Sequence, residues 1–177
     1  PVEGNYPTEF VKALTDSGYL GALIPEEYGG SGMPIRAGAV ILETIHETGC
    51  SAGACHAQMY TMGTVLRHGS DAQKKLYLPK IASGDLRLQA FGVTEPTTGS
   101  DTTQLKTRAV KDGDDYIVNG AKTWTTMAQH ADMIFCLVRT DTTVKQQEGI
   151  SFLLIDMDDP GISTTPTSGS YTHLPAH

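Results

Sequence analysis

The chain has 177 residues, of which 39% are hydrophobic and 19% charged, and its formal net charge is −7. These proportions are typical of a globular protein with a buried core, and no apolar run approaches the roughly 20 residues that a membrane-spanning helix needs. The thirteen lysines and arginines are scattered along the chain, which argues against a nucleic-acid-binding surface, because neutralising phosphates requires a basic patch.

The chain begins at Pro1 without a methionine or a leader pattern, so we expect a piece of a longer protein whose targeting signal is not visible. Its three cysteines are too few for a disulfide scaffold and favour a reducing compartment over secretion. The spacing of Cys50, Cys55, His46 and His56 fits no zinc motif, so we predict no metal site.

The first half of the chain predicts helices. Apolar residues recur at helical spacing in residues 8–17, from residue 35, from residue 51 and in residues 71–84. Ser70 is placed to cap the start of the last of these helices, and Gly84 to end it. The glycine-rich stretch 24–32 is expected to be a loop.

The second half has the alternation of strands, in residues 86–93, 105–111, 116–118, 122–126, 133–139 and 150–157. Residues 112–115 form a turn, and Asn119-Gly120 is a strong hairpin signal. Helices followed by strands indicate an α+β fold, in which a helical bundle (residues 1–86) precedes an antiparallel, β-barrel-like domain (residues 87–163). Residues 164–177 are expected to form an irregular tail.

Two segments of the second half have side chains suited to ligand binding. Residues 91–101 run from a strand into a Pro- and Gly-containing turn, and five hydroxyl side chains lie between Thr94 and Thr102. Short hydroxyls and exposed backbone N–H groups bind phosphates or the edge of a flavin, although composition alone favours a self-capped turn. In residues 119–126, a strand would place Trp124 and Thr126 on one face, although a lone tryptophan is most often core.

Together these segments resemble the acyl-CoA dehydrogenase family. Phe91-Gly92-Val93-Thr94-Glu95-Pro96 with Gly99-Ser100-Asp101 is similar to the first signature of the family, and Asn119-Gly120, Lys122 and Trp124-Thr125-Thr126 are similar to its second flavin segment. Residues 24–32 and 73–79 match its helical domain. The matches occur in order and cover nearly the whole chain from residue 8 to residue 163.

The resemblance implies FAD as cofactor, with acyl-CoA on the other side of the flavin. Residues 91–94 would line the isoalloxazine edge, Thr94 would hydrogen-bond its pyrimidine end, and Ser100 would lie by the pyrophosphate and the substrate. Trp124 would pack on the flavin and Thr126 would hydrogen-bond N5. The full set of expected cofactor-binding residues is Phe91, Val93, Thr94, Gly99, Ser100, Trp124, Thr125 and Thr126, and Ser100 is also the expected substrate-binding residue.

The sequence also departs from the family pattern. Thr97-Thr98 replaces a usual Gly-Ala-like pair, and Met127-Ala128-Gln129 replaces a Gly-rich turn. No carboxylate matches the catalytic base, so we expect no catalytic residue here and place the base in a missing C-terminal helical bundle. Glu95 precedes a proline in a turn and is expected to be structural. Met59, Tyr60 and Met62 fit core packing better than contact with an acyl chain.

We therefore expect an oxidoreductase that introduces an α,β double bond into acyl-CoA thioesters in fatty acid β-oxidation, inactive as this chain alone. A flavin oxidase or monooxygenase on the same fold and a non-catalytic fragment stay open as alternatives. The resemblance implies electron-transfer flavoprotein as electron acceptor and a homo-oligomer, either tetramer or dimer. It also implies the cytoplasm in a bacterium or the mitochondrial matrix in a eukaryote.

Overall fold

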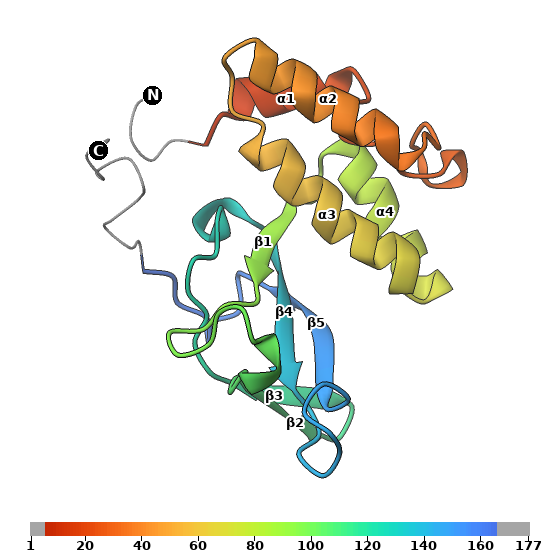
Figure 1. The fold of residues 1–177 in the computed structure, drawn as a ribbon. Coiled ribbons are helices and arrows are strands. Elements are labelled where there is room, and N and C mark those ends of the chain that lie inside the picture. The colour runs from red at the N-terminus through yellow and green to blue at the C-terminus, as the bar shows by residue number, and fades with distance from the viewer. Residues whose placement is uncertain (1–5, 166–177) are drawn as a thin grey trace, which may run out of the picture.

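A computed structural model describes residues 6–165, and it separates four helices from a five-stranded sheet (Figure 1). The helices are α1 (Thr8–Asp16), α2 (Ile35–Glu47), α3 (Gly53–His68) and α4 (Asp71–Ser83). The strands are β1 (Leu88–Gly92), β2 (Arg108–Asp112), β3 (Asp115–Asn119), β4 (Met133–Arg139) and β5 (Ile150–Asp156). The predicted α+β organisation is confirmed. The predicted tail, 164–177, lies almost wholly outside the described residues.

Both predicted ends of α4 are confirmed. The Ser70 hydroxyl accepts a hydrogen bond from the backbone N–H of Gln73 at 3.2 Å, and the Gln73 side chain accepts one from the backbone N–H of Ser70 at 2.8 Å. This reciprocal pair satisfies two N–H groups that the first helical turn leaves free. Gly84 ends the helix at φ 81°, a left-handed conformation that glycine adopts without steric cost.

Helix α3 is the centre of the helical part and connects it to the sheet. Its side chains Met59 and Met62 are buried, as the core-packing interpretation predicted. Its polar side chains bond to the strand beneath: Gln58 Nε2 donates to the carbonyl of Leu86 at 3.0 Å, and the Thr61 hydroxyl donates to that of Leu88. These bonds fix β1 under α3 at the point where the chain enters the sheet.

The sheet is mixed and open, which corrects the expected antiparallel, barrel-like sheet. β4 is its central strand and pairs with β5 antiparallel along its whole length. On its other edge, β4 pairs parallel with β1 and, at Arg139, with β2. The chain leaves β1 by a long loop, forms the β2–β3 hairpin, and returns to run beside β1 in the same direction. A connection of this kind gives parallel pairing, whereas a short hairpin does not.

The predicted turn at residues 112–115 is confirmed, because Asp112 pairs with Asp115 and Gly113 has the positive φ of 61° that such hairpin turns need. Two predictions for the residues after it are wrong. Asn119-Gly120 ends β3 and forms no hairpin turn, and a Cβ at Gly120 would lie 2.4 Å from the Thr107 hydroxyl. Residues 122–126 form no strand.

Among residues 6–165, none of the helices has both the length and the apolar character that crossing a bilayer requires.

Candidate functional site

The two segments singled out in the sequence lie side by side. Residues 93–107 connect β1 to β2, and residues 120–132 connect β3 to β4. The backbone N–H of Thr123 donates to the carbonyl of Thr94 at 2.9 Å. The Lys122 ammonium donates to the carbonyl of Val93 at 3.3 Å. The structure therefore brings together segments that are about thirty residues apart in the chain.

A buried ion pair joins the segments at their base. Lys122 Nζ lies 2.8 Å from Glu95 Oε1, and the two side chains are only 8% and 4% exposed. The Glu95 carboxylate also accepts the backbone N–H groups of Lys106 at 2.7 Å and Thr107 at 2.9 Å. Both carboxylate oxygens therefore accept hydrogen bonds from the protein, in agreement with the structural role expected for Glu95.

The charge of Glu95 is stabilised by these partners. Burial by itself raises the pKa of the carboxyl, but the Lys122 ammonium and the hydrogen bonds from Thr107 and Lys106 outweigh it and lower the pKa to about 2. The group is therefore ionised at neutral pH. A carboxylate held in this way is a poor proton acceptor, which excludes Glu95 as a general base.

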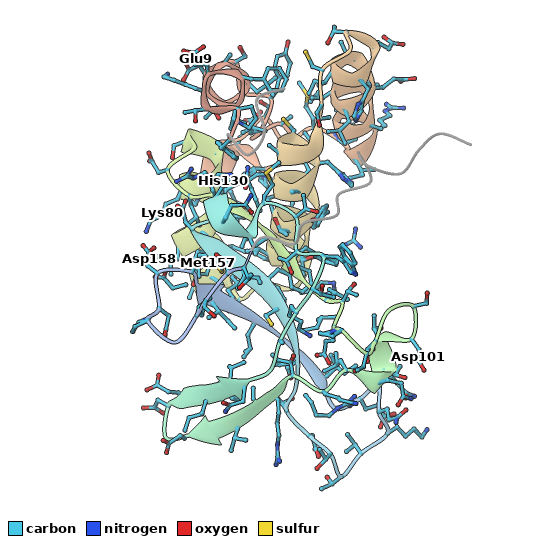
Figure 2. The ribbon with its side chains drawn as sticks, turned by 90° about the vertical axis from the view of Figure 1, so that its left-hand side faces the viewer. Glu9, Lys80, Asp101, His130, Met157 and Asp158 are labelled. Carbon is cyan, nitrogen blue, oxygen red and sulfur yellow. The ribbon has the colours of Figure 1, made fainter. Side chains whose placement is uncertain are left out.

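The turn above this ion pair presents free donors. Glu95 and Thr98 exchange two backbone hydrogen bonds, at 2.9 and 3.1 Å, which closes the turn. Beyond it, Gly99 and Ser100 are exposed, and among the described contacts their backbone N–H groups have no acceptor. Figure 2 shows Asp101 on this loop, which projects away from the helices. Successive free N–H groups form the type of concavity that binds anions.

The second segment is exposed and has an unusual backbone. Trp124 is 64% exposed in the described residues, so the interpretation of this tryptophan as a core residue is wrong. Trp124 has φ 58° and Met127 has φ 64°, and a left-handed conformation is strained for side chains of this size. The segment turns at Trp124, so the expected strand that would have paired Trp124 with Thr126 on one face is not present.

Thr125 and Thr126 differ in their surroundings. The Thr125 hydroxyl is buried and has no hydrogen-bond partner among the described residues, whereas Thr126 is exposed. A buried hydroxyl without a partner costs free energy unless something outside the chain satisfies it. This orphaned hydroxyl, in a segment with an exposed indole and free N–H groups, fits a bound polar ring system.

Of the other predicted residues, Phe91 and Val93 are both half-buried. The Phe91 ring packs edge-to-face against Tyr60, with centroids 5.0 Å apart, and against Phe135, at 4.8 Å. The side chain of Phe91 is thus used for packing between α3 and β4. Tyr60 is half-buried and lies beside this strand, unlike Met59 and Met62, which are core.

Sequence reasoning missed the partner of Glu95 and the role of Arg139. Lys122 was noted only as part of a motif, and no local pattern links it to a carboxylate 27 residues earlier. The sequence feature that could have indicated a buried ion pair is a lysine beside glycine and threonine residues, in a segment otherwise without charge. Arg139 ends β4 and contacts the loop after Glu95.

Among residues 6–165, neither the Cys55 thiol nor a cluster of metal-ligating side chains forms a second site. Burial raises the pKa of the Cys55 thiol to about 11, so this thiol is protonated. Residues 6–165 contain no group of three or more His, Cys, Asp or Glu side chains arranged to hold a metal ion. Two surface grooves, of about 410 and 470 Å³, are lined mainly by residues of the helical part, and the larger one also includes Asp132 at the end of the second segment.

Comparisons with known proteins agree with this arrangement. The N-terminal domain of acyl-CoA dehydrogenases matches residues 2–85, and the middle domain matches residues 90–175. Acyl-CoA dehydrogenase FadE29 of Mycobacterium tuberculosis is 41% identical over 157 residues, which are 88% of this chain and 40% of that protein.

Two solved structures have the same fold over most of the chain. The Tcur3481-Tcur3483 steroid ACAD has a TM-score of 0.81 at 39% identity, over 90% of this chain and 41% of that one. The prolyl acyl carrier protein oxidase AnaB has a TM-score of 0.83 at 32% identity, over 92% of this chain and 44% of that one. The chain spans about two fifths of the length of these relatives. It belongs to the acyl-CoA dehydrogenase family.

Proposed function

We propose that the protein containing this chain is an FAD-dependent acyl-CoA dehydrogenase that forms an α,β double bond in acyl-CoA thioesters. The observation that carries the proposal is the junction of residues 93–101 with residues 122–126. The Glu95–Lys122 ion pair holds the two segments together, while an exposed indole, a buried hydroxyl and several N–H groups find no partner among residues 6–165. Family membership supports the same conclusion.

The proposed roles follow the two segments. The backbone of Phe91, Val93 and Thr94 lines the edge of the isoalloxazine ring, and the Thr94 hydroxyl bonds its pyrimidine end. Gly99 and Ser100 offer N–H groups and a hydroxyl to the pyrophosphate, and Ser100 also lies by the acyl-CoA.

On the other segment, Trp124 covers the ring, Thr125 satisfies its buried hydroxyl on the cofactor, and Thr126 donates to N5. FAD, when bound, supplies the hydride acceptor at N5. Donors fixed around such a ring stabilise the charge that develops on it and need no reorganisation during the reaction.

The proton acceptor is proposed to come from outside residues 6–165. Glu95 is buried, accepts three hydrogen bonds and has a pKa of about 2, so it cannot serve. We propose the division into residues 1–86 and 87–163, the homo-oligomer, the intracellular location and electron-transfer flavoprotein as acceptor on the family resemblance alone.

The test is spectroscopic. The full-length protein should purify with, or take up, one FAD for each chain, and its flavin absorbance should bleach when acyl-CoA is added without oxygen. A protein that stays colourless in the presence of excess FAD contradicts the proposal. Bleaching by acyl-CoA but not by free CoA shows that reduction depends on the acyl group.

A flavin oxidase is the second candidate, because the solved oxidase AnaB shares the fold at 32% identity. The Thr97-Thr98 pair in the turn is a further departure from the dehydrogenase pattern. Oxygen consumption at the rate of substrate turnover assigns the oxidase, whereas reduction of an artificial electron acceptor without oxygen consumption assigns the dehydrogenase.

A further inference from the structure

Arg139, the last residue of β4, lies between two loops and bonds to both. Its guanidinium donates to the carbonyl groups of Thr103 and Leu105 in the loop after Glu95, and to the carbonyl of Gln146 in the loop between β4 and β5. Its backbone N–H donates to the carbonyl of Thr107 at 2.7 Å. One side chain therefore fixes the second half of the loop that presents Gly99 and Ser100.

A second bond connects the same two loops. The side-chain amide of Gln104 donates to the side-chain oxygen of Gln146 at 3.0 Å. From the other side, the Thr98 hydroxyl donates to the carbonyl of Gln104 at 3.4 Å. The exposed turn 99–102 is thus held at both ends, by the Glu95–Thr98 closure before it and by Arg139 after it.

The positive charge of Arg139 is not neutralised by an ion pair. The ion pairs among residues 6–165 are Lys12–Asp16, Arg87–Asp132 and Lys122–Glu95, and all the guanidinium's acceptors are neutral carbonyls. Two acids in these loops are hydrogen-bonded to threonines and keep their negative charge: Asp101 accepts from Thr103, and Asp141 accepts from Thr143. A guanidinium is always charged and presents a fixed fork of donors, so Arg139 can hold carbonyl groups of both loops at once.

We propose that Arg139 is a positioning residue for a diphosphate bound on the turn 99–102. By fixing the carbonyl groups of Thr103 and Leu105, it holds in place the turn whose Gly99 and Ser100 N–H groups have no acceptor among the described residues. This inference rests on the proposed function. Because FAD and acyl-CoA each carry a diphosphate, the chemistry recognised is the diphosphate itself.

The experiment compares ligands with and without that group, in the full-length protein. In Arg139→Met, the dissociation constant for FAD should rise by at least about tenfold, the size of a lost bond to a charged group. The dissociation constant for riboflavin, which lacks the diphosphate, should change by less than about twofold. Arg139→Lys keeps the charge without the fork of donors and should fall between the two.

A matched control removes an equal charge elsewhere. Lys111 is exposed on β2, and Lys111→Met should leave both dissociation constants unchanged. Should Arg139→Met not fold, Gln104→Leu loosens the same loop and should weaken FAD binding alone, by a smaller factor. Comparing the binding of acyl-CoA with that of acyl-pantetheine, both to the FAD-loaded protein, shows whether Arg139→Met weakens binding of the substrate's diphosphate.

The outcomes separate the two proposals. Selective loss of FAD or of acyl-CoA affinity supports the inference and assigns the diphosphate to that ligand. Equal losses for riboflavin and FAD, or no loss for any ligand, overturn it and leave the proposed function standing. A wild-type protein that binds neither flavin overturns both.

Discussion

The two segments of the candidate site are held in very different ways. Residues 93–107 are fixed by the buried Glu95 carboxylate, by the closure at Thr98 and by Arg139. Residues 120–127 are fixed at their start by Lys122 and Thr123 and at their end by Met127, which packs against the helical core; an exposed indole and a left-handed backbone lie between. The first segment is organised by the protein itself. The second is fixed at its two ends and leaves polar groups between them for a ligand to satisfy.

The Glu95–Lys122 ion pair gives the largest expected effect on stability. In Lys122→Met, the Glu95 carboxylate remains buried without its cation, which destabilises a fold by about 3–5 kcal/mol. The free energy of unfolding, measured with urea, should fall by that amount. Lys12→Met is the matched control, because Lys12 forms an ion pair of 2.6 Å with Asp16 that is 70% and 62% exposed. An exposed pair contributes at most about 1 kcal/mol. Equal losses of stability in the two variants would show that the buried Glu95–Lys122 pair contributes no more than an exposed one.

The same ion pair predicts a loss of stability in acid. The pKa of Glu95 is about 2 in the folded chain, against an ordinary value of 4.5. Because the folded pKa is the lower one, the contribution is complete above pH 4.5 and disappears as the pH falls towards 2. Its size is on the order of 3 kcal/mol. The free energy of unfolding of Glu95→Gln should lack this part of the pH dependence; a variant with the wild-type pH dependence shows that other groups cause it.

The contrast between the segments also explains what the sequence could predict. The ends of α4 depend on Ser70 and Gly84, and strands β4 and β5 depend on their own alternation, so local patterns were sufficient for them. Residues 122–126 are rich in threonine and predicted a strand. There the side chain of Lys122 is held in a buried pair with a residue 27 positions earlier, and this long-range contact overrides local propensity.

The site residues were predictable as segments but not as geometry. A family signature names Thr94, Ser100 and Trp124, and the structure does place their segments together. The left-handed backbone at Trp124 and the unpaired hydroxyl of Thr125 depend on how the segments meet. Neither feature can be predicted from the spacing of residues within one segment.

The strain at Trp124 gives a smaller effect, with an unusual sign. At ordinary positions glycine is less stable than alanine, but at φ 58° alanine retains the steric strain and glycine does not. Trp124→Gly should therefore be more stable than Trp124→Ala, by up to about 1 kcal/mol in urea unfolding. Both variants should bind FAD more weakly, because both lack the indole.

Met127 is the control for this strain, since its φ of 64° is similar and no cofactor contact is proposed for it. Met127→Gly should likewise be more stable than Met127→Ala, with FAD affinity close to that of the wild type. If alanine is the more stable residue at both positions, the backbone is not strained and the second segment is as well ordered as the first.

The smallest effects on stability should come from Thr125 and Thr126. Thr125→Val replaces a buried hydroxyl that has no partner within the described part of the chain with a methyl group of the same shape, so the free energy of unfolding without FAD should stay within about 1 kcal/mol of the wild type. FAD affinity should fall several-fold, because the cofactor loses the bond that satisfied this hydroxyl. Thr126→Val, at an exposed position, should leave unfolding unchanged and shift the flavin redox potential, because its hydroxyl is proposed to act at N5. If Thr125→Val lowers stability and leaves FAD affinity intact, the hydroxyl serves the protein, and the second segment is not the half of the site that a ligand completes.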